Sequence, residues 1–137
     1  MSLVLDASLT MAWAFDDERT PETENTMEEV GRNGAVVPPL WRLEVVNAFQ
    51  IGIRRHRIDQ IYRDKLLARL KRLPISIDQD GDNHTWTTTL RLSDRYGLTI
   101  YDACYLELAQ RLNLPLASLD QELRAAAHSL GIPLRGA

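Results

Sequence analysis

Short apolar runs and longer amphipathic segments alternate along the whole chain. The short runs, such as Leu3–Leu5 and Ala35–Val37, are bounded by Gly, Pro or polar residues, which is typical of buried strands. The longer segments carry apolar residues at spacings of three and four, which predicts helices with one buried face. The predicted strands span 3–6, 35–37, 74–77, 115–119 and 132–134, and the predicted helices span 8–15, 22–32, 40–57, 59–73, 84–96, 101–112 and 121–130.

Two of the predicted helices show their buried faces in the spacing of the apolar residues. One face should consist of Ile58, Tyr62, Leu66, Leu70 and Leu73. In the helix over 101–112, the corresponding face should consist of Tyr101, Tyr105, Leu108 and Leu112.

The order of these elements predicts the class of fold. Strands that alternate with helices favour an α/β sandwich, in which right-handed crossovers place helices on both faces of a mostly parallel sheet. The 137 residues suit one domain, 1–137, which can fold without disulfides, and we expect Cys104 to be a small buried hydrophobe. Ligands of such sheets bind beyond the carboxyl ends of the strands, where the strand order reverses.

Four carboxylates stand where a predicted strand or loop runs into a predicted helix. Asp6 and Asp120 follow apolar strands, Glu44 lies in the first turns of its helix, and Asp102 stands at a helix start. Each one alone is explained equally well as a helix cap or a first-turn acid. Brought to one edge of a doubly wound sheet, they would repel one another unless a cation lay between them. Mg²⁺ prefers oxygen ligands, so the four acids together predict metal-assisted hydrolysis of a phosphodiester.

Polar residues near these acids are candidates for supporting roles. Ser8 comes two residues after the first acid and Ser118 two residues before the last, so their hydroxyls could hold the carboxylates in place. Asn47 lies one helical turn beyond the glutamate and faces the same way. Arg55, eleven positions beyond the glutamate, returns to nearly the same face and could reach a substrate phosphate.

Charge is unevenly distributed along the chain, although the net charge is only −3. Residues 42–72 hold nine of the sixteen basic side chains, whereas residues 1–34 hold eight acidic side chains and only two basic ones, Arg19 and Arg32. The basic segment could hold phosphates, but it fits a pair of amphipathic helices with solvated faces at least as well. No apolar run approaches the roughly 18 residues of a membrane span and no secretory signal precedes the first strand, so we expect a soluble cytoplasmic protein.

These segments together resemble the PIN-domain ribonucleases, and more narrowly the VapC-type toxins of type II toxin–antitoxin modules. Each segment alone is common, but their order and spacing are specific, and the likeness runs through nearly the whole chain. The resemblance implies a PIN-like three-layer α/β/α sandwich with a five-stranded parallel sheet. It is carried by Val4–Ser8, Leu43–Ala48, Gly97–Ala109, Leu116–Asp120 and Gly131–Leu134.

The resemblance also implies an activity and partners. It implies an endoribonuclease that depends on Mg²⁺ or Mn²⁺, forms a homodimer, and is blocked by the tail of a small antitoxin protein. Asp6, Glu44, Asp102 and Asp120 occupy the acidic positions of the family, and Ser118 stands where a threonine is frequent.

Three other functions compete with this interpretation. A receiver domain of phosphorelay signalling would need an acceptor aspartate after the third strand, where Asp78 and Asp80 stand, and a lysine after the fifth strand, but no lysine follows Lys71. A phosphatase with an aspartyl nucleophile would need a second acid where Ser8 stands. A non-catalytic PIN-like module that binds RNA or protein is the third alternative, and a nuclease assay with and without EDTA distinguishes it.

Overall fold

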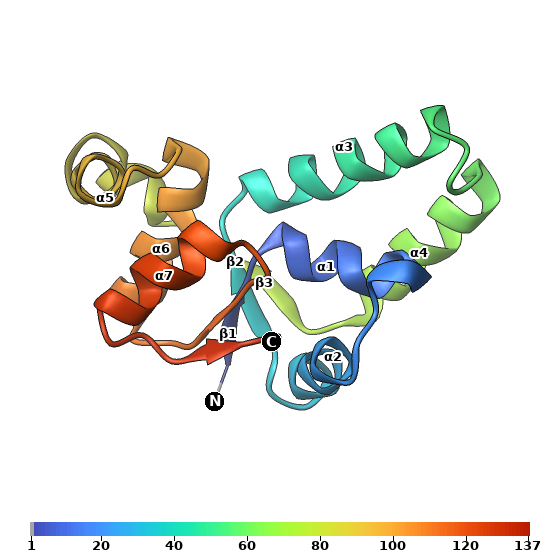
Figure 1. Ribbon diagram of the computed structural model, residues 1–137, viewed down its shortest axis with the longest axis horizontal. Helices are drawn as coiled ribbons and strands as arrows, with labels where there is room; N and C mark the ends of the chain where they lie inside the picture. Colours follow the sequence, from blue (N-terminus) through green and yellow to red (C-terminus); the bar gives the residue numbers. More distant parts are fainter. Residues whose placement is uncertain (1) are drawn as a thin grey trace.

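The computed structural model describes residues 2–137 and contains one five-stranded sheet (Figure 1). Its strands are β1 (Leu3–Leu5), β2 (Ala35–Val37), β3 (Ile75–Ile77), β4 (Leu116–Ala117) and β5 (Leu134–Arg135). The strand order is β3-β2-β1-β4-β5, and all neighbouring pairs are parallel. The predicted α/β fold with a five-stranded parallel sheet is therefore confirmed.

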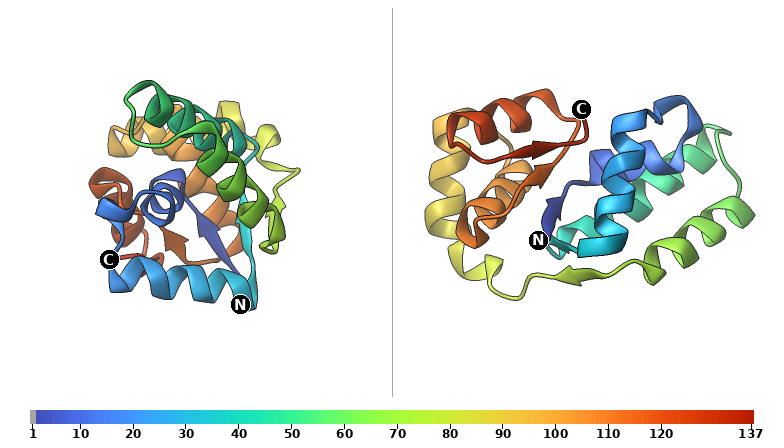
Figure 2. Two further views of the ribbon diagram at one scale, coloured as in Figure 1. Left: turned by 90° about the vertical axis from the view of Figure 1, so that its right-hand side faces the viewer. Right: turned by 90° about the horizontal axis from the view of Figure 1, so that it is seen from below.

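The helices form two groups, one on each side of the strands (Figure 2). This arrangement is the one that right-handed crossovers produce when the chain winds first one way from β1 and then the other. The first group contains α1 (Ala7–Ala14), α2 (Pro21–Asn33), α3 (Leu40–Arg54) and α4 (Gln60–Arg72). The second group contains α5 (Leu90–Tyr96), α6 (Ile100–Leu112) and α7 (Gln121–Ser129).

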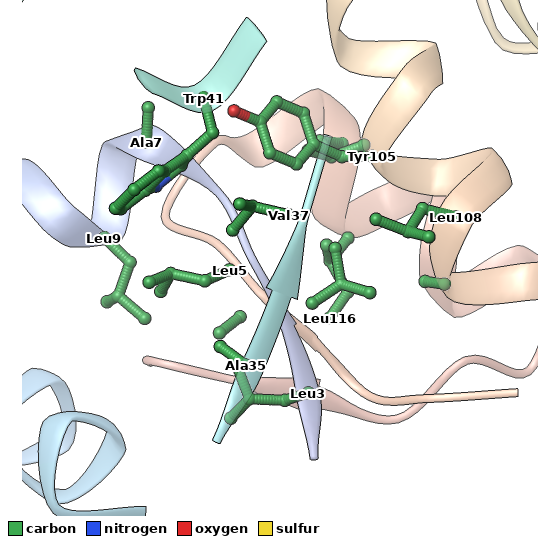
Figure 3. Close-up of a cluster of buried hydrophobic side chains, with 14 of the residues drawn as sticks. Leu3, Leu5, Ala7, Leu9, Ala35, Val37, Trp41, Tyr105, Leu108 and Leu116 are labelled. Carbon is green, nitrogen blue, oxygen red and sulfur yellow. The ribbon is translucent and has the colours of Figure 1, made fainter. Parts of the chain in front are cut away.

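The core lies around the central strand β1. Leu3, Val4 and Leu5 are all fully buried, because a central parallel strand is covered on both faces. Trp41 at the start of α3 packs into the same cluster, and its indole N–H donates to the Thr10 hydroxyl of α1 at 3.1 Å (Figure 3). This contact joins α3 to α1 close to the carboxyl end of β1.

The segment before α5 differs from its prediction. A continuous helix was expected from His84, but the chain forms a 3₁₀ turn, η2 (Gly81–His84), and then a π-helical turn, η3 (Thr85–Thr89). Four of the five residues of η3 are threonines, and β-branched side chains lower the preference for a regular α-helix. Gly97 ends α5 in the left-handed conformation, as expected of a C-cap glycine.

The predicted apolar face of α6 is only half correct. Tyr105 and Leu108 are buried, whereas Tyr101 is 66% exposed and Leu112 is 40% exposed. A 13-residue helix is about 20 Å long, whereas a three-residue strand spans about 10 Å, so both ends of α6 extend beyond the sheet. Cys104 of the same helix is half-buried, and burial raises the pKa of its thiol, which agrees with a packing role.

Among residues 2–137, no helix has the length and apolar character needed to cross a membrane.

Candidate active site

The strand order reverses between β1 and β4, and two of the candidate acids follow these strands. From β1 the chain moves outward to β2 and β3, and it then returns to place β4 on the other side of β1. Asp6 comes directly after β1, and Asp120 comes three residues after the end of β4. Open α/β sheets bind their ligands beside such a reversal, beyond the carboxyl ends of the strands.

Asp6 is buried, with 4% of its surface exposed, and two hydroxyl groups hold its carboxylate. Ser8 donates a hydrogen bond to Oδ2 at 2.6 Å, and Ser118 donates to the same oxygen at 2.7 Å. Asp6 stands at the N-cap position of α1, but its side chain makes no capping bond. Helix capping therefore does not explain this residue, and the predicted hydroxyl support is present.

The two serines also connect the chain segments that leave β1 and β4. The Ser8 hydroxyl accepts a hydrogen bond from the Leu119 amide at 3.0 Å, and the Ser118 hydroxyl accepts one from the Asp120 amide at 3.0 Å. Ser118 thus supports the carboxylate of Asp6, across the sheet, and not the carboxylate of its own neighbour. Because both hydroxyls contact Oδ2, the hydroxyl donors leave Oδ1 of Asp6 available to a ligand.

Glu44 is half-buried in the second turn of α3 and is held by a residue that the sequence analysis missed. The Tyr105 hydroxyl, from α6, donates a hydrogen bond to Glu44 Oε1 at 2.5 Å. Burial and this bond raise the pKa of Tyr105 far above its ordinary value, so the phenol remains a donor. The signal in the sequence was a tyrosine on an apolar helix face, because a buried phenol needs a partner for its hydroxyl.

Asp102 and Asp120 both lie at helix starts but differ in what they do there. Thr99 caps α6 by accepting a hydrogen bond from the Asp102 amide at 3.1 Å, so the Asp102 side chain is not the cap. The Asp120 side chain does cap α7, because its Oδ1 accepts a hydrogen bond from the Leu123 amide at 2.8 Å. Helix capping therefore accounts for one oxygen of the Asp120 carboxylate.

The charges of these four acids act on one another's pKa values. Burial, with the charges of Asp120 and Asp6 acting in the same direction, raises the pKa of Asp102 to about 6. Burial also raises the pKa of Glu44, and the charges of Asp6 and Asp102 raise it as well. For Asp6, burial outweighs the two serine bonds, so its pKa is raised as well. Such mutual repulsion between carboxylates is what a bound cation relieves.

The donor set of this cluster suits a hard divalent cation. Its side chains offer carboxylate oxygens, which Mg²⁺ prefers, and not the thiolates and imidazoles typical of zinc sites. Within residues 2–137, no group of three or more His, Cys, Asp or Glu side chains is placed so that it could hold a metal ion. Mg²⁺ is usually bound by one or two carboxylates and keeps several waters, so a site for it does not require three protein ligands.

Asn47 and Arg55 lie on α3 but are not joined to the acidic cluster by any hydrogen bond that the structure records. Asn47 is exposed one turn beyond Glu44, as predicted. Arg55 is exposed at the C-terminal end of α3. It is eleven positions beyond Glu44, which is roughly 16 Å along a helix.

Asp78 and Asp80, the candidate phosphate acceptors of the receiver alternative, lie at an edge of the sheet. Asp78 follows the edge strand β3, and its carboxylate accepts hydrogen bonds from Arg111 at 2.7 and 3.3 Å. Burial alone would raise the pKa of Asp78, but Arg111 holds it below its usual range. Arg111 also pairs with the buried Glu107 at 2.8 Å. These bonds tie the chain after β3 to α6 and occupy the carboxylate of Asp78, which argues against Asp78 as an accessible phosphate acceptor.

The chain belongs to the PIN domain family, whose model matches residues 3–129. A protein from Pyrobaculum aerophilum named Ribonuclease VapC3 is 25% identical to it over 97% of this chain and 100% of that protein.

Solved structures have the same fold. A crystal structure from Pyrobaculum aerophilum matches with a TM-score of 0.68 and 23% identity, over 92% of this chain and 84% of the other. VapBC2 from Rickettsia felis, bound to a DNA fragment from its promoter, matches with a TM-score of 0.64 and 17% identity, over 98% and 97% of the two chains. A toxin–antitoxin complex from Klebsiella pneumoniae matches with a TM-score of 0.53 and 18% identity, over 86% of each chain.

Proposed function

We propose that this protein is a metal-dependent endoribonuclease and the toxin of a type II toxin–antitoxin pair. The observation that supports the proposal is that hydrogen bonds of Ser118 and Tyr105 link the chain segments carrying four carboxylates, Asp6, Glu44, Asp102 and Asp120, beside the reversal of strand order. The name of the similar Pyrobaculum aerophilum protein, Ribonuclease VapC3, supports RNA as the substrate.

Each acid has its own place in the proposed site. Asp6 is the ligand with the most fixed orientation, because two hydroxyls donate hydrogen bonds to its carboxylate. Asp102 is half-buried, and its pKa is raised to about 6, so a neighbouring positive charge would favour its ionised form. Glu44 approaches from α3, and Asp120 contributes the oxygen that does not cap α7.

The ion in this proposal is Mg²⁺ or Mn²⁺. When bound, it would supply Lewis acidity, which acidifies water and offsets the negative charge that develops on the phosphate. The protein residues hold the ion and align the RNA, and none of them has to act as a nucleophile. Ser8 and Ser118 hold one ligand, and the exposed Asn47 and Arg55 lie along α3, where they can contact the RNA chain.

The proposed partners are RNA, a cognate antitoxin protein and a second copy of this chain. Two of the structurally similar proteins are toxin–antitoxin assemblies, which supports an antitoxin partner. We place the protein in the cytoplasm, because its RNA substrate and its antitoxin are made there. Growth arrest on expression, relieved by the product of a small neighbouring open reading frame, tests the toxin part of the proposal.

The nuclease activity is tested with purified protein and a single-stranded RNA. Cleavage should require Mg²⁺ or Mn²⁺ and stop in EDTA, and Asp102→Asn should reduce it by about 10²–10³-fold. The matched control is Asp94→Asn, which neutralises an exposed aspartate of α5 and should leave cleavage unchanged. Full activity of Asp102→Asn in Mg²⁺, or equal cleavage in EDTA, would contradict the proposal and favour a binding module.

A further inference from the structure

Among residues 2–137, no recorded hydrogen bond joins the Glu44 carboxylate to another residue of α3. Leu43 beside it is 71% exposed, and Asn47 one turn further along is exposed as well. A glutamate also has more freely rotating side-chain bonds than an aspartate, so it loses more freedom when it binds a cation in one orientation. Something outside α3 must therefore hold Glu44 if it is to be a ligand in a fixed place.

Tyr105 is the residue that reaches Glu44 from outside α3. It lies on α6, 61 residues further along the chain, and its hydroxyl donates to Glu44 Oε1 at 2.5 Å. A hydrogen bond of this length from a hydroxyl to a carboxylate belongs to the strong, charge-assisted class. Because Oε1 receives this bond, Oε2 is the oxygen left to face a ligand.

The tyrosine itself is rigidly placed. Tyr105 is fully buried, and its ring is packed in the core beside Leu106 and Leu108. Figure 3 shows the hydroxyl at the outer end of the ring, on the side of Trp41 of α3. Close packing prevents the ring from following a moving partner, so the hydroxyl is a fixed point for the carboxylate.

We propose that Tyr105 is a positioning residue that fixes Glu44 for metal binding by anchoring its Oε1 from the core. This inference rests on the proposed metal-dependent function. Tyr105 does the same for Glu44 as Ser8 and Ser118 do for Asp6. In each case hydroxyl donors form hydrogen bonds with one oxygen of the carboxylate and leave the other oxygen for the ion. Groups that orient metal ligands in this way contribute to affinity without touching the metal.

The test is Tyr105→Phe, which removes the hydroxyl and keeps the ring. The half-saturating Mn²⁺ concentration for RNA cleavage should rise about tenfold, whereas kcat at saturating Mn²⁺ should stay close to that of the wild type. The second readout needs no cleavage: the rise in Tm that Mn²⁺ alone produces should be smaller in the variant at equal Mn²⁺ concentration.

Two matched variants separate positioning from stability. Tyr96→Phe removes a buried hydroxyl that has no hydrogen-bond partner among residues 2–137, and it should leave the Mn²⁺ midpoint unchanged. Tyr62→Phe removes a hydroxyl that donates to the Ala14 carbonyl at 2.8 Å, so it should lower Tm without moving that midpoint.

The outcomes distinguish the two proposals. A Tyr105→Phe protein with a lower Tm but a wild-type Mn²⁺ midpoint would overturn the positioning role. A wild-type protein that binds Mn²⁺ but does not cleave RNA would overturn the nuclease function, and the Tm readout would then decide the role of Tyr105. A wild-type protein that neither binds Mn²⁺ nor cleaves RNA would overturn both.

Discussion

The acidic cluster and the pair of helices α3 and α4 are built in opposite ways. Asp6 and Glu44 are held by hydroxyls that come from distant parts of the sequence, Ser118 and Tyr105. Seven of the nine basic side chains of residues 42–72 lie on α3 and α4 (Figure 1), Arg55 and Arg57 lie in the turn between these helices, and most of the nine are exposed. Of these nine, only Arg57 and Arg63 form salt bridges with other residues in the range 2–137.

The difference teaches how each region can use its charge. A cation that is to be held in one place needs ligands in fixed orientations, and tertiary contacts provide them. Phosphates along a flexible RNA can be bound by separate solvated charges, because that attraction does not require one geometry. We therefore expect substitutions of the acids and their supporting residues to have large effects on activity, and substitutions of the basic side chains of residues 42–72 to have small effects that depend on salt.

Among substitutions of the residues that hold the acids, the largest effect is expected from Ser118→Ala. It removes a fully buried hydroxyl that donates to Asp6 and accepts from the Asp120 amide. The free energy of unfolding should fall by about 1–3 kcal/mol, because buried groups lose their partners. Cleavage should fall about tenfold, because Asp6 loses one of its two hydroxyl donors. Chemical denaturation and single-turnover cleavage measure the two quantities.

Ser129→Ala is the matched control for Ser118→Ala. The Ser129 hydroxyl donates to the Ala125 carbonyl on the exposed part of α7, so its loss should change the free energy of unfolding by less than about 0.5 kcal/mol. Equal effects of the two substitutions would show that the contact with Asp6 contributes no more to stability or cleavage than an exposed serine contact does.

An intermediate effect is expected from the pH dependence of stability without metal. Burial and the neighbouring acids raise the pKa of Asp102 from 3.8 to about 6, so between these values the folded protein binds more protons than the unfolded chain. The free energy of unfolding should therefore fall as the pH rises from about 4 to about 6, and solvent screening limits the share of Asp102 to roughly 1 kcal/mol. Asp6 and Glu44, whose pKa values are also raised, act in the same direction.

Asp102→Asn sharpens this measurement because it removes the titrating group. Above pH 6 the variant should be more stable than the wild type by roughly 1 kcal/mol in metal-free buffer, because one buried negative charge is absent. Denaturation curves at several pH values in EDTA measure this difference. A variant that is less stable than the wild type at neutral pH would contradict the repulsion inferred for the cluster.

The smallest effect is expected from Arg55→Ala. The Kd for RNA should rise by about two- to threefold. The slope of log Kd against log salt concentration should decrease by about 1, as expected for the loss of one phosphate contact, and kcat should be unchanged. Arg32→Ala, at an exposed position of α2, is the control that should change neither quantity. A loss of kcat in Arg55→Ala would break the division between the acidic cluster and the basic helices.

The sequence predicted the strands and helices well because their apolar patterns are local. Leu3–Leu5 was recognised as a strand because it is uniformly apolar, and it is the fully buried central strand. The turns before α5 were missed, since several neighbouring threonines weaken a helix without cancelling its pattern. The exposure of Tyr101 was not predicted, because the spacing of apolar residues does not show which turns of a helix extend beyond the sheet that it covers.

The sequence by itself determined the elements, their order, and four acids at the ends of strands and the starts of helices. It also placed Ser8 close to Asp6, because that relation is local. Only the tertiary structure decided that Ser118 supports Asp6 from a different strand, that Tyr105 supports Glu44 from a different helix, and that Arg55 lies a helix length away from the acids. The physical reason is that a hydrogen bond depends on position and direction in space, and sequence spacing reports these only within one helix or one strand.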